Sequence, residues 1–368
     1  MKKTITIMIC FSIASLFMTL SCMDENEIPE YNSGIGDQTG YPAPVWEVYL
    51  GSYSEPCNVW CVDVNNEYFL ASGNNAVRHW FIGFYPQLKR TTGGLSGDVL
   101  SAAFVYPNQQ YPILVGQEDG YLLRFRWIPI MGGEKRDTLN IKKTGEIPIH
   151  AIDVSNSDPQ KCLIARYDTV EYWQTVLPKE FEKLKTYTIE QGVESNTYIW
   201  SIDFCSGDQY FITGGFDKNV YKWNISVQYS LFHFEDHSLE GLHPPSHKDR
   251  VRSVKVASNS SFVLSGGNDG KLKKWDLNGN LICTFNGHSD RPYGFISSIT
   301  ITDDNCTAVT GGDDGEIRVW DVQNNNAFAI AGFHVGGVHS VAILKGASGT
   351  NYILSSGADG KVKCWNIP

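Results

Sequence analysis

The chain has 368 residues, of which 42% are hydrophobic and 19% are charged, with 35 glycines, 10 tryptophans and only 5 methionines. This composition is typical of a turn-rich globular protein, and it excludes both a disordered chain and a disulfide-stapled miniprotein. The net charge of −10 disfavours nucleic acid as a partner, because affinity for a phosphate backbone needs clustered Lys and Arg side chains.

Residues 1–21 have the pattern of a secretory signal peptide. Two lysines precede an uncharged, largely apolar run over residues 4–21, which is too short for a comfortable membrane span. Residues 19–22 resemble the cleavage box of bacterial lipoproteins, in which a small residue precedes a cysteine that is lipidated. We therefore expect lipidation at Cys22, and a plain signal peptide with a chance cysteine is the alternative.

Residues 22–43 are expected to form a flexible tether after the lipidated cysteine. The segment is polar and rich in Gly and Pro, and its residues 23–43 could reach about 70 Å when extended. Its acidic start, residues 23–27, resembles the surface-export signal of Bacteroidetes lipoproteins, and a solvated acidic tail is the alternative. These features predict an exported lipoprotein anchored in the outer membrane, on its periplasmic or cell-surface side, with the lipid as its only membrane attachment.

From residue 44 to residue 368 the chain repeats one unit. Four copies are clear, at residues 212–225, 264–277, 309–322 and 354–367, and three weaker copies lie at residues 69–80, 114–127 and 163–173. Their equivalent aromatic residues are spaced by 45, 48, 50, 52, 45 and 45 positions, and they are Trp80, Phe125, Trp173, Trp223, Trp275, Trp320 and Trp365. This period, with Gly-Asp turns between alternating apolar stretches, is typical of four-stranded propeller blades.

An apolar stretch that precedes each repeat is expected to be the innermost strand of a blade. In the fifth unit, for example, residues 262–265 enter an Asn-Asp-Gly turn suited to a tight hairpin, and residues 271–275 return. The inner strands are predicted at residues 59–64, 99–104, 149–154, 199–204, 251–256, 296–301 and 338–343. Seven inner strands predict an all-β, seven-bladed propeller.

The Gly-His and Trp-Asp pairs in these units, such as Gly287-His288 and Trp275-Asp276, resemble the WD-repeat β-propeller family over residues 44–368. The resemblance implies that a turn Asp, an upstream His, a Ser or Thr and the Trp form a structural hydrogen-bond network in a blade. The residues so implied are His247, Ser265, Asp269 and Trp275; His288, Thr310, Asp314 and Trp320; and His334, Ser355, Asp359 and Trp365. The first three units lack the Gly-His pair.

The last unit ends with its third strand at Ile367, so it lacks an outer strand. Residues 45–50 precede the first inner strand and have no other partner. We expect this N-terminal strand to complete the last blade and close the ring.

Ligands of propellers usually meet the mouth of the central channel, where the inner strands begin. The second residues of the inner strands are expected there, and they are Trp60, Leu100, His150, Trp200, Arg252, Ser297 and His339. The aromatic, imidazole and guanidinium groups of Trp60, His150, Trp200, Arg252 and His339 suit stacking on a planar group and pairing with an anion. Packing between blades is the alternative role of the two tryptophans.

Other candidate sites carry weaker signals. The His-rich loop over residues 233–247 could offer metal ligands, but its spacing matches no zinc signature, so we expect no metal. Asp63, Asp153 and Asp203 recur at one inner-strand position and could act as acid and base, although a structural role suits repeated positions better. Seven cysteines after Cys22 form an odd, scattered set that does not indicate a disulfide framework.

No nucleophile elbow, Walker loop or dinucleotide fingerprint occurs, so no cofactor is expected. The sequence therefore favours a non-catalytic scaffold, expected as a monomer, that binds a protein or peptide at the cell envelope. One alternative is a surface lipoprotein that binds glycan through Trp60 and Trp200. Another is a propeller enzyme that acts on carbohydrate or uses a redox cofactor.

Overall fold

The protein was analysed as a computed structural model. It describes residues 42–49, 59–64, 68–73, 76–81, 87–92, 95–105, 113–130, 133–143, 147–176, 180–189, 198–227, 230–236, 238–239, 244–288, 294–345 and 350–368. The predicted signal peptide and nearly all of the predicted tether, including Cys22, lie outside these residues. Within them there is no helix of the length and apolarity that a membrane crossing requires.

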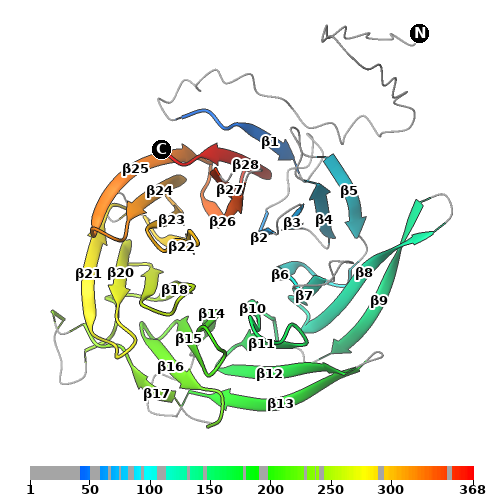
Figure 1. Cartoon of the computed structure of the whole chain (residues 1–368), viewed down its shortest axis with the longest axis horizontal. Coiled ribbons are helices and arrows are strands. Elements are labelled where there is room, and N and C mark those ends of the chain that lie inside the picture. The colour runs from blue at the N-terminus through cyan, green and yellow to red at the C-terminus, as the bar shows by residue number, and fades with distance from the viewer. Residues whose placement is uncertain are drawn as a thin grey trace, which may run out of the picture.

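The described strands form seven four-stranded antiparallel sheets arranged as blades around a central opening (Figure 1). This arrangement confirms the predicted seven-bladed propeller. Blades 1 to 3 are β2 (Cys61–Val64), β3 (Tyr68–Gly73), β4 (Ala76–Phe81) and β5 (Gln87–Thr92); β6 (Val99–Phe104), β7 (Ile113–Gln117), β8 (Tyr121–Ile130) and β9 (Gly133–Lys143); and β10 (Ala151–Val154), β11 (Lys161–Arg166), β12 (Thr169–Val176) and β13 (Glu180–Thr188).

Blades 4 to 6 follow in the same order, from the channel outward. They are β14 (Ile199–Phe204), β15 (Tyr210–Gly215), β16 (Val220–Asn224) and β17 (Ser230–His233); β18 (Val251–Val256), β19 (Val263–Gly267), β20 (Lys271–Trp275) and β21 (Leu281–Asn286); and β22 (Ile296–Ile301), β23 (Thr307–Gly312), β24 (Glu316–Asp321) and β25 (Asn326–Phe333). Blade 7 is β26 (Val338–Lys345), β27 (Asn351–Gly357), β28 (Lys361–Asn366) and β1 (Trp46–Tyr49).

The predicted inner strands agree closely with the observed ones. Those of blades 2, 4, 5 and 6 coincide with β6, β14, β18 and β22. β2 and β10 begin two residues later than predicted, and β26 extends to Lys345. Phe125 pairs with Ile113 in the register that Trp275 has with Val263, so its backbone takes the place that tryptophan holds in other blades.

The hydrophobic core is divided into clusters that lie between neighbouring blades. One cluster joins Val309 and Ile317 of blade 6 to Val338 and Trp365 of blade 7. Close contact between blades needs small residues on the second strands: a Cβ built on Gly266 would lie 2.6 Å from Cγ2 of Ile296 in the next blade. The glycines of the repeat therefore let the blades pack side by side.

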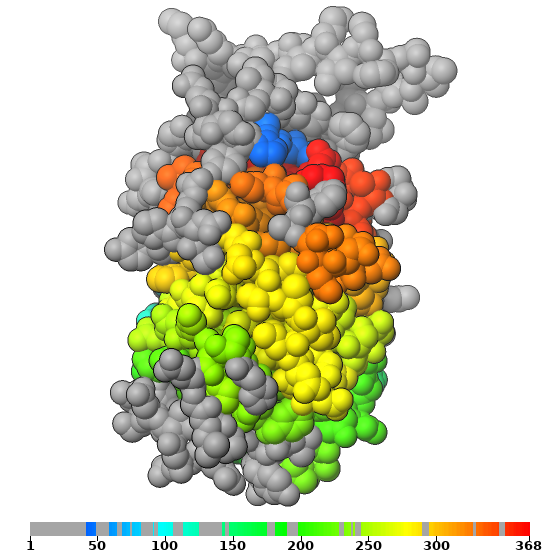
Figure 2. Space-filling model, turned by 90° about the vertical axis from the view of Figure 1, so that its left-hand side faces the viewer, coloured from blue at the N-terminus to red at the C-terminus, as the bar shows by residue number. Residues whose placement is uncertain are grey.

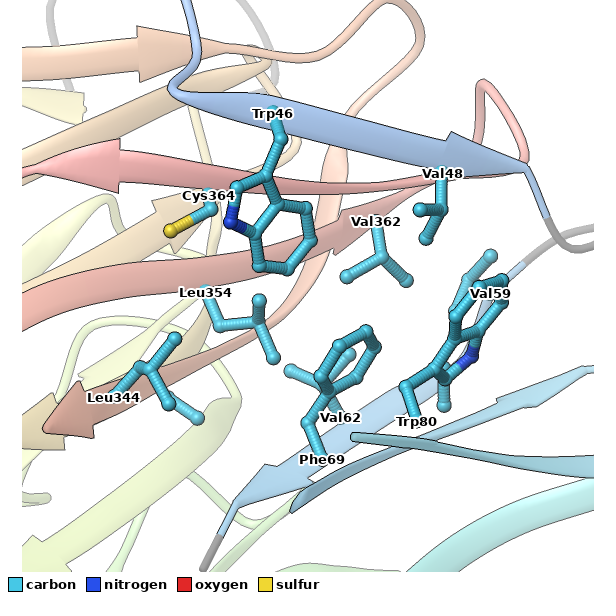
Figure 3. Close-up of a cluster of buried hydrophobic side chains, with 12 residues drawn as sticks. Trp46, Val48, Val59, Val62, Phe69, Trp80, Leu344, Leu354, Val362 and Cys364 are labelled. Carbon is cyan, nitrogen blue, oxygen red and sulfur yellow. The ribbon is translucent and has the colours of Figure 1, made fainter. Parts of the chain in front are cut away.

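The N-terminal strand closes the ring, as predicted. β1 pairs with β28 in antiparallel register, with Trp46 opposite Cys364 and Val48 opposite Val362. In the side view, the blue N-terminal strand lies against red C-terminal residues (Figure 2). Trp46 also stacks on Phe69 of blade 1, with 5.5 Å between the ring centroids (Figure 3). β1 therefore contributes to the core on both sides of the seam between the last and first blades.

Blades 5 to 7 each contain a continuous chain of buried hydrogen bonds from tryptophan to aspartate. In blade 7, Trp365 Nε1 donates to Ser355 Oγ at 2.7 Å, and His334 contacts Ser355 Oγ through Nε2 and Asp359 through Nδ1, at 2.7 and 2.8 Å. The same contacts join the members of the other two sets. The structure thus brings together all twelve residues that the resemblance implies, at 2.7–3.0 Å.

In blades 3 and 4, a different acceptor binds the indole N–H of the equivalent tryptophan. In blade 3, Trp173 Nε1 donates to Glu171, which also lies 3.6 Å from Arg166. In blade 4, Trp223 Nε1 donates to Thr213 at 2.8 Å, and the hydroxyl of Tyr221 donates to the turn residue Asp217. Blades 3 and 4 therefore bind the tryptophan N–H without a histidine, whereas in blade 1 the buried Nε1–H of Trp80 has no hydrogen-bond partner among the described residues.

Candidate functional site: the channel mouth

The inner strands enclose one cavity of about 640 Å³, which is the central channel. All seven second residues of the predicted inner strands line it. We call these seven the mouth residues, and they are Trp60, Leu100, His150, Trp200, Arg252, Ser297 and His339. The structure therefore brings together residues that span 280 positions of the sequence.

A backbone irregularity directs these side chains. In five blades the pairing of the first and second strands skips one residue, so that Val251 pairs with Gly267 and Ser253 with Gly266, while Arg252 between them has no partner. The same β-bulge occurs at Leu100, Trp200, Ser297 and His339. A bulge adds a residue to one strand and turns its side chain away from the regular alternation. In the sequence, these strands look like ordinary alternating strands, so the bulges could not be recognised there.

On one side of the mouth, Trp60 and His339 stack across the seam between blades 1 and 7. Their ring centroids lie 4.9 Å apart, with 16° between the ring planes. The Nδ1–H of His339 donates to the carbonyl oxygen of Val59 at 3.0 Å. Burial lowers the pKa of His339, despite that hydrogen bond, so the ring is neutral at pH 7. One face of Trp60 is therefore covered by a neutral imidazole.

On the other side, arginine and aromatic side chains alternate. The guanidinium carbon of Arg252 lies 4.8 Å from the ring centroid of Trp200, and that of Arg250 lies 3.7 Å from the ring centroid of Phe216. Trp200 and Phe216 contact each other edge to face, with centroids 5.9 Å apart. His150 contacts Tyr198 in the same part of the mouth. Two of the residues expected at the mouth, Trp200 and Arg252, are therefore in contact, and Arg250 and Phe216 extend this group.

Deeper in the channel lie three carboxylates and one lysine. We call Asp63, Asp153 and Asp203 the inner carboxylates. Each accepts a backbone N–H from the inner strand of the next blade: Asp63 from Phe104, Asp153 from Phe204, and Asp203 from Val256. Asp203 also forms an ion pair with Lys255 at 2.5 Å. These bonds tie neighbouring blades together around the channel, which is the structural role weighed above.

Asp63 and Asp153 differ from ordinary aspartates in their ionisation. Burial and the neighbouring charge of Asp203 raise the pKa of Asp153 to about 7, although Lys255 and two backbone N–H groups oppose the increase. Burial also raises the pKa of Asp63. Burial would lower the pKa of Lys255, but Asp203 and Asp153 outweigh burial and raise it, so the ammonium stays charged. With both oxygens of Asp63 and of Asp153 accepting backbone N–H groups, these side chains are held in place and are poorly suited to transfer protons.

The His-rich loop gives little indication of a metal site. His247 is buried in the network of blade 5, and His233 lies at the end of β17, with Nε2 3.5 Å from Glu235. His237 and His243, the remaining candidates, lie outside the described residues. No group of three or more His, Cys, Asp or Glu side chains with metal-binding geometry occurs in the part of the chain that the structure describes.

The cysteines in the described ranges are all free, and they are Cys61, Cys162, Cys205, Cys283, Cys306 and Cys364. Burial raises the pKa of the Cys61 thiol to about 11 and those of Cys162, Cys205 and Cys364 to about 12. These thiols are therefore protonated and unreactive at neutral pH. Cys57, the seventh cysteine, is outside the described residues.

A comparison with protein families agrees with this architecture. The model described as WD40, WD domain, G-beta repeat, matches residues 184–224, 241–276, 279–321 and 332–366. The chain is a seven-bladed propeller with WD40 repeats. The matched segments contain the first three strands of blades 4 to 7, and three of them contain the complete Trp–Ser/Thr–His–Asp networks. A comparison with curated proteins found no match.

WD40 propellers typically serve as protein-interaction scaffolds and are generally non-catalytic. Because one fold supports many functions, the partner has to be inferred from the site itself.

Proposed function

We propose that this WD40 propeller is a non-catalytic scaffold at the bacterial cell envelope that binds a protein or peptide partner at its channel mouth. The observation that carries the proposal is the ring of mouth residues, all of which line the channel and five of which lie at β-bulges. Aromatic and arginine side chains are enriched among residues that dominate binding energy at protein interfaces. The mouth combines both types, whereas the deeper channel is lined by hydrogen-bonded structural carboxylates.

Site-specific photo-crosslinking tests the location of binding. A photoreactive amino acid at His150, in the mouth, is compared with one at Ile282, which is 47% exposed on the outer strand β21. Intact cells are irradiated and the products are identified by mass spectrometry. We expect a defined protein adduct from position 150 and none from position 282. Equal adducts from both positions, or none from position 150, would contradict binding at the mouth.

The proposed envelope location rests on the predicted signal peptide and the lipoprotein-like box at residues 19–22. We propose that Cys22 carries the lipid and that residues 23–43 tether the propeller to the outer membrane. Metabolic labelling with an alkyne fatty acid tests this step. Label is expected on the wild-type protein and not on the Cys22→Ala variant, and an unlabelled wild type would refute the anchor.

Glycan binding is the competing proposal, and the geometry favours it less. A sugar stacks on an open aromatic face. His339 covers one face of Trp60, and Arg252 lies over Trp200. A glycan array probed with the wild type and the Trp60→Ala/Trp200→Ala variant decides between the two. Binding that is lost in a folded variant would replace the protein partner with a carbohydrate.

A further inference from the structure

Arg252 is held in a fixed orientation at the mouth. Its Nε donates to Asn268 Oδ1 at 2.7 Å, and its guanidinium lies against the rings of Trp200 and Phe295, at 4.8 and 5.8 Å from their centroids. Within the described residues, the Nη atoms of Arg252 donate to no protein acceptor. The planar end of the side chain is therefore both positioned and available for a ligand in the channel mouth.

Arg250 adds a second guanidinium nearby. It lies over the ring of Phe216, and its backbone N–H donates to Asp249. Asp249 and Asp313 are close enough to favour the charged form of Arg252. No carboxylate of the described chain, however, lies within ion-pair distance of either guanidinium.

Most partly buried cations of the described chain have an acceptor for their charged end: Lys222 and Lys274 donate to carbonyl oxygens, and others form ion pairs. Those with carboxylate partners are Arg166, Lys255, Lys273, Arg318, Lys361 and Lys363. A buried or half-buried cation is normally paired, because burial removes part of its hydration. Burial lowers the pKa of Arg252, which reflects this uncompensated environment.

We propose that Arg252, assisted by Arg250, binds a side-chain carboxylate of an acidic peptide segment supplied by the partner. This inference rests on the proposed function and specifies the chemistry of the partner. A guanidinium presents parallel N–H donors that match the two oxygens of a carboxylate. Trp200, Phe216 and Phe295 surround this pair with apolar surface, which suits the neighbouring side chains of a peptide.

The charge distribution along the channel sets the depth of the acidic group. At the mouth, Arg252 lines the cavity with Arg250 close to it, and Asp249 and Asp313 nearby form no ion pair with either guanidinium. The deeper wall carries the three inner carboxylates and the single Lys255. An anion is attracted by the arginines at the mouth and repelled by the carboxylates of the deeper wall. The carboxylate is therefore expected to stop at the arginines, and a dianionic phosphate would meet stronger repulsion than a carboxylate.

The experiment uses peptides selected from a random phage-displayed library on the purified full-length protein. Each selected peptide is synthesised together with a version in which Asp and Glu are replaced by Asn and Gln, and affinities are measured by fluorescence anisotropy. Acidic peptides are expected to be enriched, and their amide versions are expected to bind at least about tenfold more weakly, the loss of roughly one charge-assisted hydrogen-bonded pair.

Matched variants distinguish paired hydrogen bonding by the guanidinium group, called the fork below, from general attraction of an acidic peptide to positive charge. Arg252→Lys keeps the charge and removes the fork, so it should weaken binding at least about tenfold, and Arg250→Lys should weaken it less. Lys248→Ala removes an exposed charge that is close to both arginines in the sequence, and it should change the affinity less than about twofold. Circular dichroism and the melting temperature verify that each variant is folded.

The outcomes distinguish failure of the acidic specificity from failure of the proposed scaffold function. Peptides that crosslink to the mouth but are neutral or basic would overturn the acidic specificity and leave the scaffold function intact. Equal losses from Lys248→Ala and Arg252→Lys would also overturn it, because binding would then follow net charge alone. Failure to select any peptide, combined with glycan binding that depends on Trp200, would overturn both proposals.

Discussion

His339 donates a hydrogen bond through Nδ1–H to the carbonyl oxygen of Val59, 280 residues earlier in the sequence, at 3.0 Å. The bond joins the inner strand of the last blade to the start of the first blade, and the stacking of His339 on Trp60 lies beside it. The channel mouth therefore includes the seam at which the ring closes. Its geometry depends on β1, which holds the two blades together from the outside.

Weakening the closing strand should destabilise the whole propeller. Trp46 is 7% exposed and contacts Phe69 of blade 1, so Trp46→Ala should lower the free energy of unfolding by about 3–5 kcal/mol. Urea denaturation followed by fluorescence measures the change. Val45, next to it and 38% exposed, is the matched control, and its replacement by Ala should cost less than about 0.5 kcal/mol.

Deletion of residues 44–51 is a stronger form of the same test. The deletion removes β1 and exposes the edge of β28, so cooperative unfolding should be lost. An unchanged melting temperature in the deleted protein would show that the ring closes without β1.

The serine of a blade network should contribute more to the free energy of unfolding than an exposed serine. Ser355→Ala leaves the buried Nε1–H of Trp365 without its acceptor and Nε2 of His334 without its donor, so it should cost about 2–4 kcal/mol. Ser206 is exposed and has no side-chain hydrogen bond to another described residue, so Ser206→Ala should cost less than about 0.5 kcal/mol. Similar losses from both variants would show that the network adds no stability.

The histidine networks should make the protein less stable in acid. Burial lowers the pKa of His247 and His334 below 6.5, so as the pH falls through this value the unfolded chain binds protons that the native state does not. Burial alone would raise the pKa of Asp269 and Asp359, but their histidine partners outweigh it and lower the pKa of both. The stability that these carboxylates contribute is present above pH 3.8 and is lost as the pH falls below it.

The contribution of these histidines to the free energy of unfolding should therefore decrease as the pH falls from about 7 to 4, and urea denaturation of the wild type and of His334→Gln over this range isolates it. His334→Gln is expected to be less stable at pH 7 and to show a shallower decrease, because one protonation step is removed. A decrease as steep as that of the wild type would rule out this histidine as a contributor.

Asp153 should have the opposite effect near neutral pH. Its pKa is raised from 3.8 to about 7, so the native state holds a proton that the unfolded chain has already released. The stability from this difference is present below pH 3.8, declines as the pH rises, and is lost by about pH 7. Carbon-detected NMR of the Asp153 carboxyl should show titration near pH 7. A midpoint near pH 4 would contradict the effect of burial and Asp203.

The sequence predicted the fold well because the repeat combines three consistent local signals. Turn residues, alternating strands and a regular tryptophan spacing all indicate the same four-stranded unit, and the missing outer strand of the last unit predicts the pairing of β1 with β28. The list of mouth residues could also be read from strand position, and all seven line the channel.

What the sequence could not predict depends on geometry between units. The bulges at Trp200 and Arg252 interrupt strands with unremarkable patterns. Phe216 and Arg250 lie on different blades and lie outside the inner strands, so only the three-dimensional structure brings them together. The replacement of histidine by Tyr221 in blade 4 likewise depends on side-chain contacts rather than on a motif.

The pairing of β1 with β28 also determines the order of events during biosynthesis. Residues 361–366 are synthesised after the first six blades, and they are the partners of Trp46–Tyr49, which are made before all of them. Until then, the apolar side chains of Trp46 and Val48 have no sheet to complete. Ring closure therefore has to wait until β28 has been made, and a nascent chain halted before residue 361 is a substrate for chaperones rather than a shorter propeller.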